Sequence, residues 1–190
     1  VSQIARIVAK GDGNASGSYQ LNIEPTGKLR LYFYGDRNIL SSDNVIKANS
    51  WQHLVLTRNG TSLKGYVNTV EVIDHSFSAD LDFTSSQGLY IGSDFYYGNF
   101  FNGLIDEVAM WNEGLTSAEV TALYNSGSGL NASSNSGNYT SSSNLKGYWK
   151  MNEGSGTSIA DASSNSNTGT ISGATWSTDS PISDGTKVNY

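Results

Sequence analysis

The sequence of 190 residues contains no cysteine, so neither a disulfide framework nor a thiolate metal site can form. It has only two histidines, which argues against a transition-metal centre. Lysine and arginine total 11 against 17 aspartates and glutamates, and this net charge of −6 argues against a nucleic acid partner, because phosphate binding relies on basic side chains. No apolar run approaches the ~20 residues that cross a bilayer, so membrane insertion is not expected. An acidic chain of this kind suits a hard cation such as calcium better.

The composition instead favours an all-β protein. There are 21 glycines, 11 tyrosines and 4 tryptophans, and serine, threonine and asparagine are abundant between the apolar runs. Alternating or apolar runs that turn residues separate predict the strands Ile4–Val8, Tyr19–Ile23, Leu29–Tyr34, Trp51–Thr57 and Leu63–Val67. The length fits one domain, or one domain with an appendage.

The segment Leu89–Gly127 combines strands, an aromatic loop and a short helix. Leu89–Ile91 and Leu104–Trp111 are predicted as strands. Thr116, followed three residues later by Glu119, is typical of a capping box that begins a helix. That helix is expected to end near Asn125 and Gly127, which tolerate positive φ.

The pattern F-x-G-x-I-D-E-V-x-x-W-N-x-x-L-[ST]-x-x-E-V-x-x-L-Y, from Phe101 to Tyr124, resembles the closing motif of laminin-G-like domains. These domains belong to the concanavalin A-like lectin/glucanase superfamily. The N-x-W-x-H strand and the L-x-x-Y-V-N strand between Asn49 and Asn68 support the resemblance, which covers residues 5–127. It implies an all-β, concanavalin A-like jelly-roll β-sandwich of two antiparallel sheets, with one short helix near residues 116–124.

The composition changes after Gly127. Residues 1–128 are predicted to form the laminin-G-like sandwich, and the Ser/Asn/Gly-rich residues 129–144 a linker or a long surface loop. Residues 145–190 resemble the opening motif of the same kind of domain, so they either complete the sandwich or begin a truncated second repeat. Completion is favoured because some 45 residues cannot bury Trp149 and Trp176 alone.

Catalysis is not expected. Glucanases of the superfamily use carboxylates in an E-x-D-x-x-E pattern, which does not occur here. Asp106 and Glu107 are adjacent, so on a continuous strand they would point to opposite faces. Asp80 and Asp82 lie in a polar stretch that indicates a solvated loop, and His53 occupies the position of a packed histidine in the related strand.

Binding is better supported by the loop Ser93–Asn102, which is rich in aromatic residues. Such rings stack on the apolar face of a sugar, while asparagine and aspartate bind its hydroxyls. If most of these rings pack inward, Tyr96, Tyr97 and Asn99 are the members expected to be exposed. We therefore predict a ligand site at Tyr96, Tyr97, Asn99 and Asp94.

The resemblance also implies one calcium site built from loop carboxylates and carbonyls. Asp106 in the I-D-E-V motif is the best-aligned candidate, with Asp36 or Asp94 as loop partners.

Three functions follow from these observations. The first is a non-catalytic recognition module that binds glycans or a surface protein in an extracellular setting, on a cell or virion surface. The alternative is a structural component of a phage particle or surface appendage, such as a capsid decoration, fibre or repeat array, that acts through protein–protein contacts, self-assembly or neighbouring repeats. A hydrolase is the third, and the carboxylate spacing does not predict it.

Overall fold

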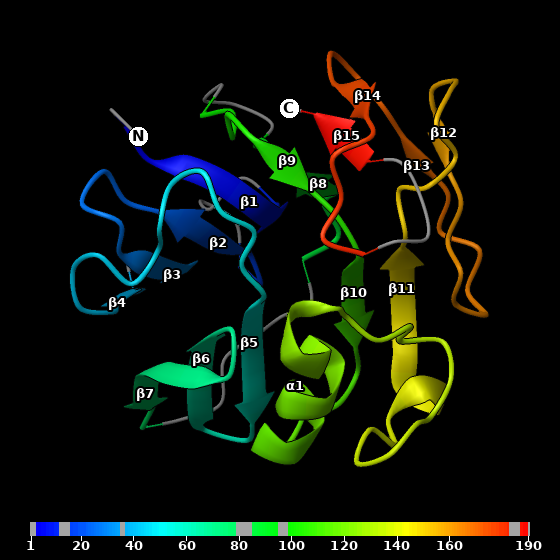
Figure 1. Cartoon of the computed structure of the whole chain (residues 1–190). Helices are drawn as coiled ribbons and strands as arrows, with labels where there is room; N and C mark the ends of the chain where they lie inside the picture. Colours follow the sequence, from blue (N-terminus) through cyan, green and yellow to red (C-terminus); the bar gives the residue numbers. More distant parts are fainter. Residues whose placement is uncertain are drawn as a thin grey trace. The chain divides into compact units, whose positions relative to one another are not determined.

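The computed structural model describes residues 3–11, 16–34, 37–78, 85–94, 99–182 and 187–189. The chain divides into two compact units, Val1–Asn102 and Gly103–Tyr190, and each is described by itself (Figure 1). The last strands and the helix of the laminin-G-like segment therefore belong to the same compact unit as the C-terminal residues.

The first unit contains an antiparallel five-stranded sheet with the strand order β4-β3-β2-β1-β8. Its strands are β1 (Ala5–Lys10), β2 (Tyr19–Ile23), β3 (Leu29–Phe33), β4 (Arg37–Leu40) and β8 (Leu89–Ile91). The β2–β3 turn requires glycine, because Gly27 has φ +72° and a Cβ there would lie 2.9 Å from the carbonyl oxygen of Ile46. This confirms the hairpin predicted for these two strands.

A second antiparallel sheet of the first unit has the order β5-β6-β7. Its strands are β5 (Leu54–Asn59), β6 (Ser62–Val67) and β7 (Val70–Ser76). At the β6–β7 turn Asn68 adopts φ 56°, and its backbone and side chain both bind the backbone of His53. Asparagine thus takes the left-handed position of this turn.

The core of the first unit joins residues of both sheets. Leu29, Leu31 and Phe33 alternate along β3 and pack with residues of β6 and β7. The complete cluster consists of Leu29, Leu31, Phe33, Leu63, Val67 and Ile73. Each such side chain contributes roughly 1.5–3 kcal/mol when fully buried, so this face of β3 is a main source of stability for the unit.

The second unit consists of small antiparallel sheets and a helix. Its elements are β9 (Leu104–Ile105), β10 (Val108–Trp111), α1 (Ser117–Tyr124), β11 (Leu145–Trp149), β12 (Ser158–Ile159), β13 (Gly169–Thr170), β14 (Thr175–Ser177) and β15 (Lys187–Asn189). β10 pairs with β11, β12 with β13, and β15 with both β14 and β9 (Figure 1). C-terminal strands therefore pair with both β9 and β10.

The predicted continuous strand Leu104–Trp111 is wrong at its centre. The chain leaves the extended conformation between β9 and β10, and Glu107 adopts φ 52°. The alternation of side chains is broken there, so the prediction that Asp106 and Glu107 point to opposite faces no longer follows. Glu107 instead accepts a hydrogen bond from the hydroxyl of Tyr148 on β11.

The predicted helix and its capping box are confirmed. The backbone N–H of Glu119 donates to Thr116 Oγ1 at 3.2 Å, and the backbone N–H of Thr116 donates to Glu119 Oε2 at 3.0 Å. The helix ends at Asn125, which has φ 46°. Val120 and Leu123 are its buried apolar residues.

Residues 129–144 form a loop that is anchored within the second unit. Tyr139 is fully buried, its hydroxyl donates to the carbonyl of Ala132 at 2.7 Å, and it accepts a hydrogen bond from Trp111 Nε1 at 2.9 Å. One aromatic side chain thus fixes the centre of an otherwise polar segment.

The chain is mostly β, its sheets are antiparallel, and the described residues contain one short α-helix. This confirms the predicted fold class, the jelly-roll β-sandwich. Among the described helices, none has the length and apolar composition needed to cross a membrane.

Candidate ligand-binding loop

The predicted ligand and metal residues are only partly described. Tyr96, Tyr97 and Asp36 lie outside the described residues. Asp94 and Asn99 lie in the first unit, where Arg6 contacts both. Arg6 was not among the predicted site residues.

Arg6 on β1 holds the two described flanks of the aromatic loop. Its side-chain Nε donates to Asp94 Oδ2 at 2.6 Å, and its backbone N–H donates to the carbonyl of Asn99 at 3.1 Å. The Asp94 side chain is inaccessible to solvent and that of Arg6 is 11% exposed. The pair is therefore a buried, charge-assisted hydrogen bond, a strong and geometrically specific contact.

Two further backbone hydrogen bonds close the base of the loop. The N–H of Gly92 donates to the carbonyl of Ile7, and the N–H of Phe101 donates to the carbonyl of Gly92, both at 2.8 Å. Gly92 has φ 76°, a conformation that favours glycine. Because the loop ends lie against each other and against β1, its flanking residues are held in defined positions.

The contacts of Arg6 with Asp94 and Asn99 are called the clamp below. One aromatic ring beside this clamp is exposed. The side chain of Phe100 is 66% accessible, although it immediately follows the anchored Asn99. The sequence analysis placed the exposed rings at Tyr96 and Tyr97. An accessible aromatic side chain on a fixed base can stack on a flat apolar ligand surface.

The clamp adjoins a polar face of the five-stranded sheet. Cross-strand partners point to the same face, so Arg6, Asn22 and Arg30 form one row across β1, β2 and β3. Gln20 and Tyr32 are partners in the next row. These residues alternate with the apolar ones of β2 and β3, which place their side chains in the core.

A β-bulge keeps Arg6 in this polar row. The register of β1 against β2 shifts between Arg6 and Val8 and leaves Ile7 without a direct partner. The bulge accommodates the consecutive apolar residues Ile7 and Val8, which a strictly alternating strand would send to opposite faces. The arginine within the apolar run IARIV was the sequence signal for this site.

The polar row retains hydrogen-bonding capacity. Asn22 is fully buried and Arg6 is 9% exposed, yet Asn22 Oδ1 and Arg6 Nη1 have no hydrogen-bond partner among the described residues. Buried polar atoms are normally satisfied, so each of these exceptions needs an explanation.

The described residues of the first unit do not form a ready calcium site. The carboxylate of Asp94 is neutralised by Arg6, so a cation would have to displace a guanidinium. Within the described ranges, histidine, aspartate and glutamate do not form a group of three or more that could hold a metal ion. The calcium site at Asp106, Asp36 and Asp94 stays a prediction.

Two carboxylates of the second unit serve as structural acceptors. Glu119 accepts hydrogen bonds from Thr116, Thr140 and Ser141. Burial raises the pKa of Glu119, but the hydrogen bonds from Ser141, Thr116 and Thr140 outweigh this effect and lower it to about 2.

Asp161 organises the loop after β12 in the same way. It accepts from the backbone N–H groups of Tyr148, Ser163 and Asn167, each at 2.8 Å. Burial raises the pKa of Asp161, and these hydrogen bonds hold it below its usual range. Both carboxyls are therefore ionised at neutral pH, whereas a general acid in glycoside hydrolysis needs a raised pKa.

Comparisons with known proteins agree with this fold. Residues 1–121 match a laminin-G family model described as "Concanavalin A-like lectin/glucanases superfamily". A search of curated protein sequences found no significant match.

Two solved structures were also found. A crystal structure described as a "putative carbohydrate binding protein from Bacteroides ovatus ATCC 8483" aligns with a TM-score of 0.64 and 20% identity, over 89% of this chain and 51% of that chain. The chain thus spans about half the length of that protein. An S-layer domain-containing protein from Clostridium thermocellum ATCC 27405 aligns with a TM-score of 0.39 and 23% identity, over 65% of this chain and 64% of that chain, which is too distant to support an argument.

Proposed function

Because the chain belongs to the concanavalin A-like lectin/glucanase superfamily, we propose that it is a non-catalytic carbohydrate-binding module. It acts outside the cell, on a cell or virion surface, and binds a glycan at the loop that Arg6 holds. Its proposed partner is a glycan rather than a nucleic acid.

The observation that carries this proposal is the exposed Phe100 ring beside the clamp. Phe100 is 66% accessible, and its neighbour Asn99 is anchored to Arg6. A sugar ring can stack on Phe100, while the amide of Asn99 binds its hydroxyls. We propose that Tyr96 and Tyr97 extend this surface and that Asp94 positions the loop through Arg6.

The carboxylates favour binding over hydrolysis. The superfamily includes glucanases, which need one carboxylic acid that stays protonated and one that is ionised. Glu119 and Asp161 are instead held by several hydrogen-bond donors that lower their pKa. Neither of them is set up to give a proton to a leaving sugar.

The Bacteroides ovatus protein lends further support through its description as a carbohydrate binding protein. At 20% identity the likeness concerns the fold, so the ligand of this chain must be found by experiment.

The test is a broad glycan array probed with the full chain, with and without calcium. Binding to a defined family of glycans is expected, and a calcium requirement would identify the predicted metal as part of the site. An array without signal in both conditions would contradict the proposal.

We also propose that residues 145–190 complete the laminin-G-like fold, whose closing strands they pair with. β11 pairs with β10 from Val108 to Trp111, and β15 pairs with β9. Deleting residues 129–190 would leave both strands without these partners, and exposed strand edges promote aggregation. A truncated chain that stays monomeric with an unchanged Tm would contradict completion.

The alternative, a structural component of a phage particle or appendage, requires strands that pair between chains. The pairing of β11 and β15 within one chain favours the binding module instead. Concentration-dependent assembly in light scattering would restore the alternative.

A further inference from the structure

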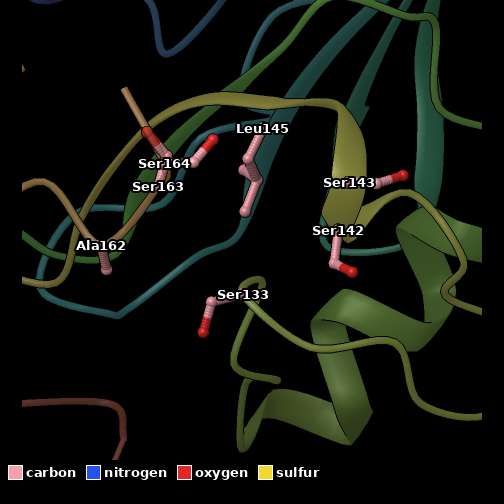
Figure 2. A pocket seen from close by; sticks show the side chains of 7 residues that line it. All are labelled: Ser133, Ser142, Ser143, Leu145, Ala162, Ser163 and Ser164. Carbon is pink, nitrogen blue, oxygen red and sulfur yellow. The ribbon is translucent and has the colours of Figure 1, made fainter. Parts of the chain in front are cut away.

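The second unit contains a hollow whose walls are mainly serine. Its volume is about 290 Å³, and Leu145 and Ala162 complete the lining. Figure 2 shows the five serines around it: Ser133, Ser142, Ser143, Ser163 and Ser164. They come from the first part of the loop 129–144, the short 3-10 helix Ser142–Asn144 at its end, and the loop after β12.

Each wall is fixed by one polar side chain. Asn131 Oδ1 accepts from both the backbone N–H and the hydroxyl of Ser133. Asp161 accepts from the backbone N–H and the hydroxyl of Ser163, at 2.8 Å each. The shape of these walls is therefore set before any ligand arrives, which lowers the entropic cost of binding.

The third wall is fixed from two sides. The backbone N–H of Ser142 donates to Asn135 Oδ1 at 3.0 Å, and the preceding Ser141 donates its hydroxyl to Glu119. Ser141 and Ser142 are thus held by Glu119 in the first turn of α1 and by Asn135 earlier in the same loop.

Three hydroxyls of the lining remain available. Those of Ser142, Ser143 and Ser164 make no hydrogen bond to the described residues. Each can both donate and accept, which matches the hydroxyls of a sugar. Leu145 and Ala162 offer a small apolar surface between them (Figure 2).

The charges around the hollow favour a neutral ligand. The residues that line the hollow are all neutral, and two side chains that fix its walls, Glu119 and Asp161, are carboxylates. An anion would meet these negative charges without a lysine or arginine in the lining to offset them. A neutral ligand has no such penalty.

We infer that this hollow binds a single neutral sugar ring, at a site separate from the loop of the first unit. Its volume lies at the small end of the roughly 300–1,000 Å³ of ligand sites, so one ring fits better than a chain. Because hydroxyls exchange protein bonds for water bonds at little net gain, the affinity is in the millimolar range.

The experiment is a titration of the isotope-labelled full chain with D-glucose, D-galactose and D-mannose, followed by two-dimensional amide NMR. A parallel titration with inorganic phosphate tests whether the hollow binds an anion. The test variant is Ser143→Ala with Ser164→Ala, which removes two free hydroxyls without touching Asn131, Asp161 or Glu119. The matched control is Ser155→Ala with Ser172→Ala, two exposed serines outside the hollow.

One of the hexoses is expected to give saturable shifts in residues 133, 142–145 and 162–164. The test variant weakens this binding roughly tenfold, as the loss of two hydrogen bonds implies, and the control variant does not. A second variant, Ser164→Gln, places a larger side chain in the lining and is expected to reduce binding as well.

Three outcomes overturn the inference: no saturable shift with any hexose, a response to phosphate alone, or equal binding by the test and control variants. Binding at the proposed site in the first unit is measured separately in the same spectra. Shifts around residues 92–101 report the proposed function, so either site can fail without the other.

Discussion

Arg6–Asp94 in the first unit and Glu119 in the second each fix a polar loop with one buried carboxylate, but with different partners. Asp94 is neutralised by a guanidinium, whereas Glu119 is surrounded by hydroxyl and amide donors. Both carboxylate oxygens of Glu119 are occupied by hydrogen bonds within the fold. At Arg6, Nη1 has no hydrogen-bond partner among the described residues, beside a loop that exposes Phe100.

The difference separates a structural anchor from a candidate binding site. A carboxylate that only neutral donors stabilise keeps its charge through hydrogen bonds and needs no counter-ion. The arginine of an ion pair has several polar atoms, and not all of them make hydrogen bonds within the fold. This difference supports the proposed ligand site at the first anchor and a structural role for the second.

The largest effect is expected from Arg6→Met, which leaves Asp94 buried without its cation. Breaking one side of a buried pair costs about 3–5 kcal/mol in the free energy of unfolding. Urea denaturation measures this loss. The double variant Arg6→Met with Asp94→Leu should recover much of the stability, because no charge is then left buried; a single variant as stable as the parent would show that the pair is not a structural clamp.

Glu119→Ala is expected to be the next most damaging change. It removes the acceptor for Thr116, Thr140 and Ser141, and leaving such partly buried donors without a partner costs about 1–3 kcal/mol. Glu113→Ala is the matched control, since Glu113 is exposed and accepts one bond from Asn144. Equal losses in the two variants would refute the assignment of Glu119 as an anchor.

Acid should reveal the same anchor. The pKa of Glu119 is about 2 when folded and 4.5 when unfolded, so the unfolded state takes up the proton first as pH falls. The stabilisation is complete above pH 4.5 and is lost as pH falls towards 2. Across this pH window the free energy of unfolding should fall more steeply with decreasing pH for the parent chain than for Glu119→Gln. Identical pH dependences would contradict the lowered pKa.

How far the sequence predicts these features depends on how local they are. The capping box of Thr116 and Glu119 and the hairpin around Gly27 involve neighbours in the chain, and both were predicted correctly. Arg6 finds Asp94 88 positions away, so no local pattern could identify that pair. Phe100 was missed because five rings in one loop look alike in the sequence, and only the fold shows that Phe100 is exposed.

Tertiary context also overrode a regular pattern. The mainly apolar run Leu104–Trp111 is typical of one strand, yet the chain bends at Asp106 and Glu107. β9 pairs with β15 and β10 pairs with β11, so two different partners share what the sequence presents as one strand. The sites predicted at Tyr96, Tyr97 and Asp36 lie outside the described residues and stay predictions.

A smaller loss of stability is expected from changing Tyr139, a neutral side chain that anchors a loop of the second unit. Tyr139→Phe removes the hydrogen bonds to Ala132 and from Trp111 but keeps the buried ring. The expected loss is about 1–2 kcal/mol, since two buried partners lose their bonds. A Tm unchanged within error would show that packing alone holds the loop 129–144.

The most direct measurement of the central claim is calorimetric titration of Phe100→Ala with the strongest ligand from the glycan array. Tyr34→Ala is the control, because Tyr34 is also an exposed aromatic residue of the first unit, at 47% accessibility, but lies away from the clamp at the end of β3. The account predicts at least a tenfold weaker affinity for Phe100→Ala, since a stacked ring contributes about 1.5 kcal/mol or more, and an unchanged affinity for Tyr34→Ala. Full binding by a folded Phe100→Ala variant would contradict it.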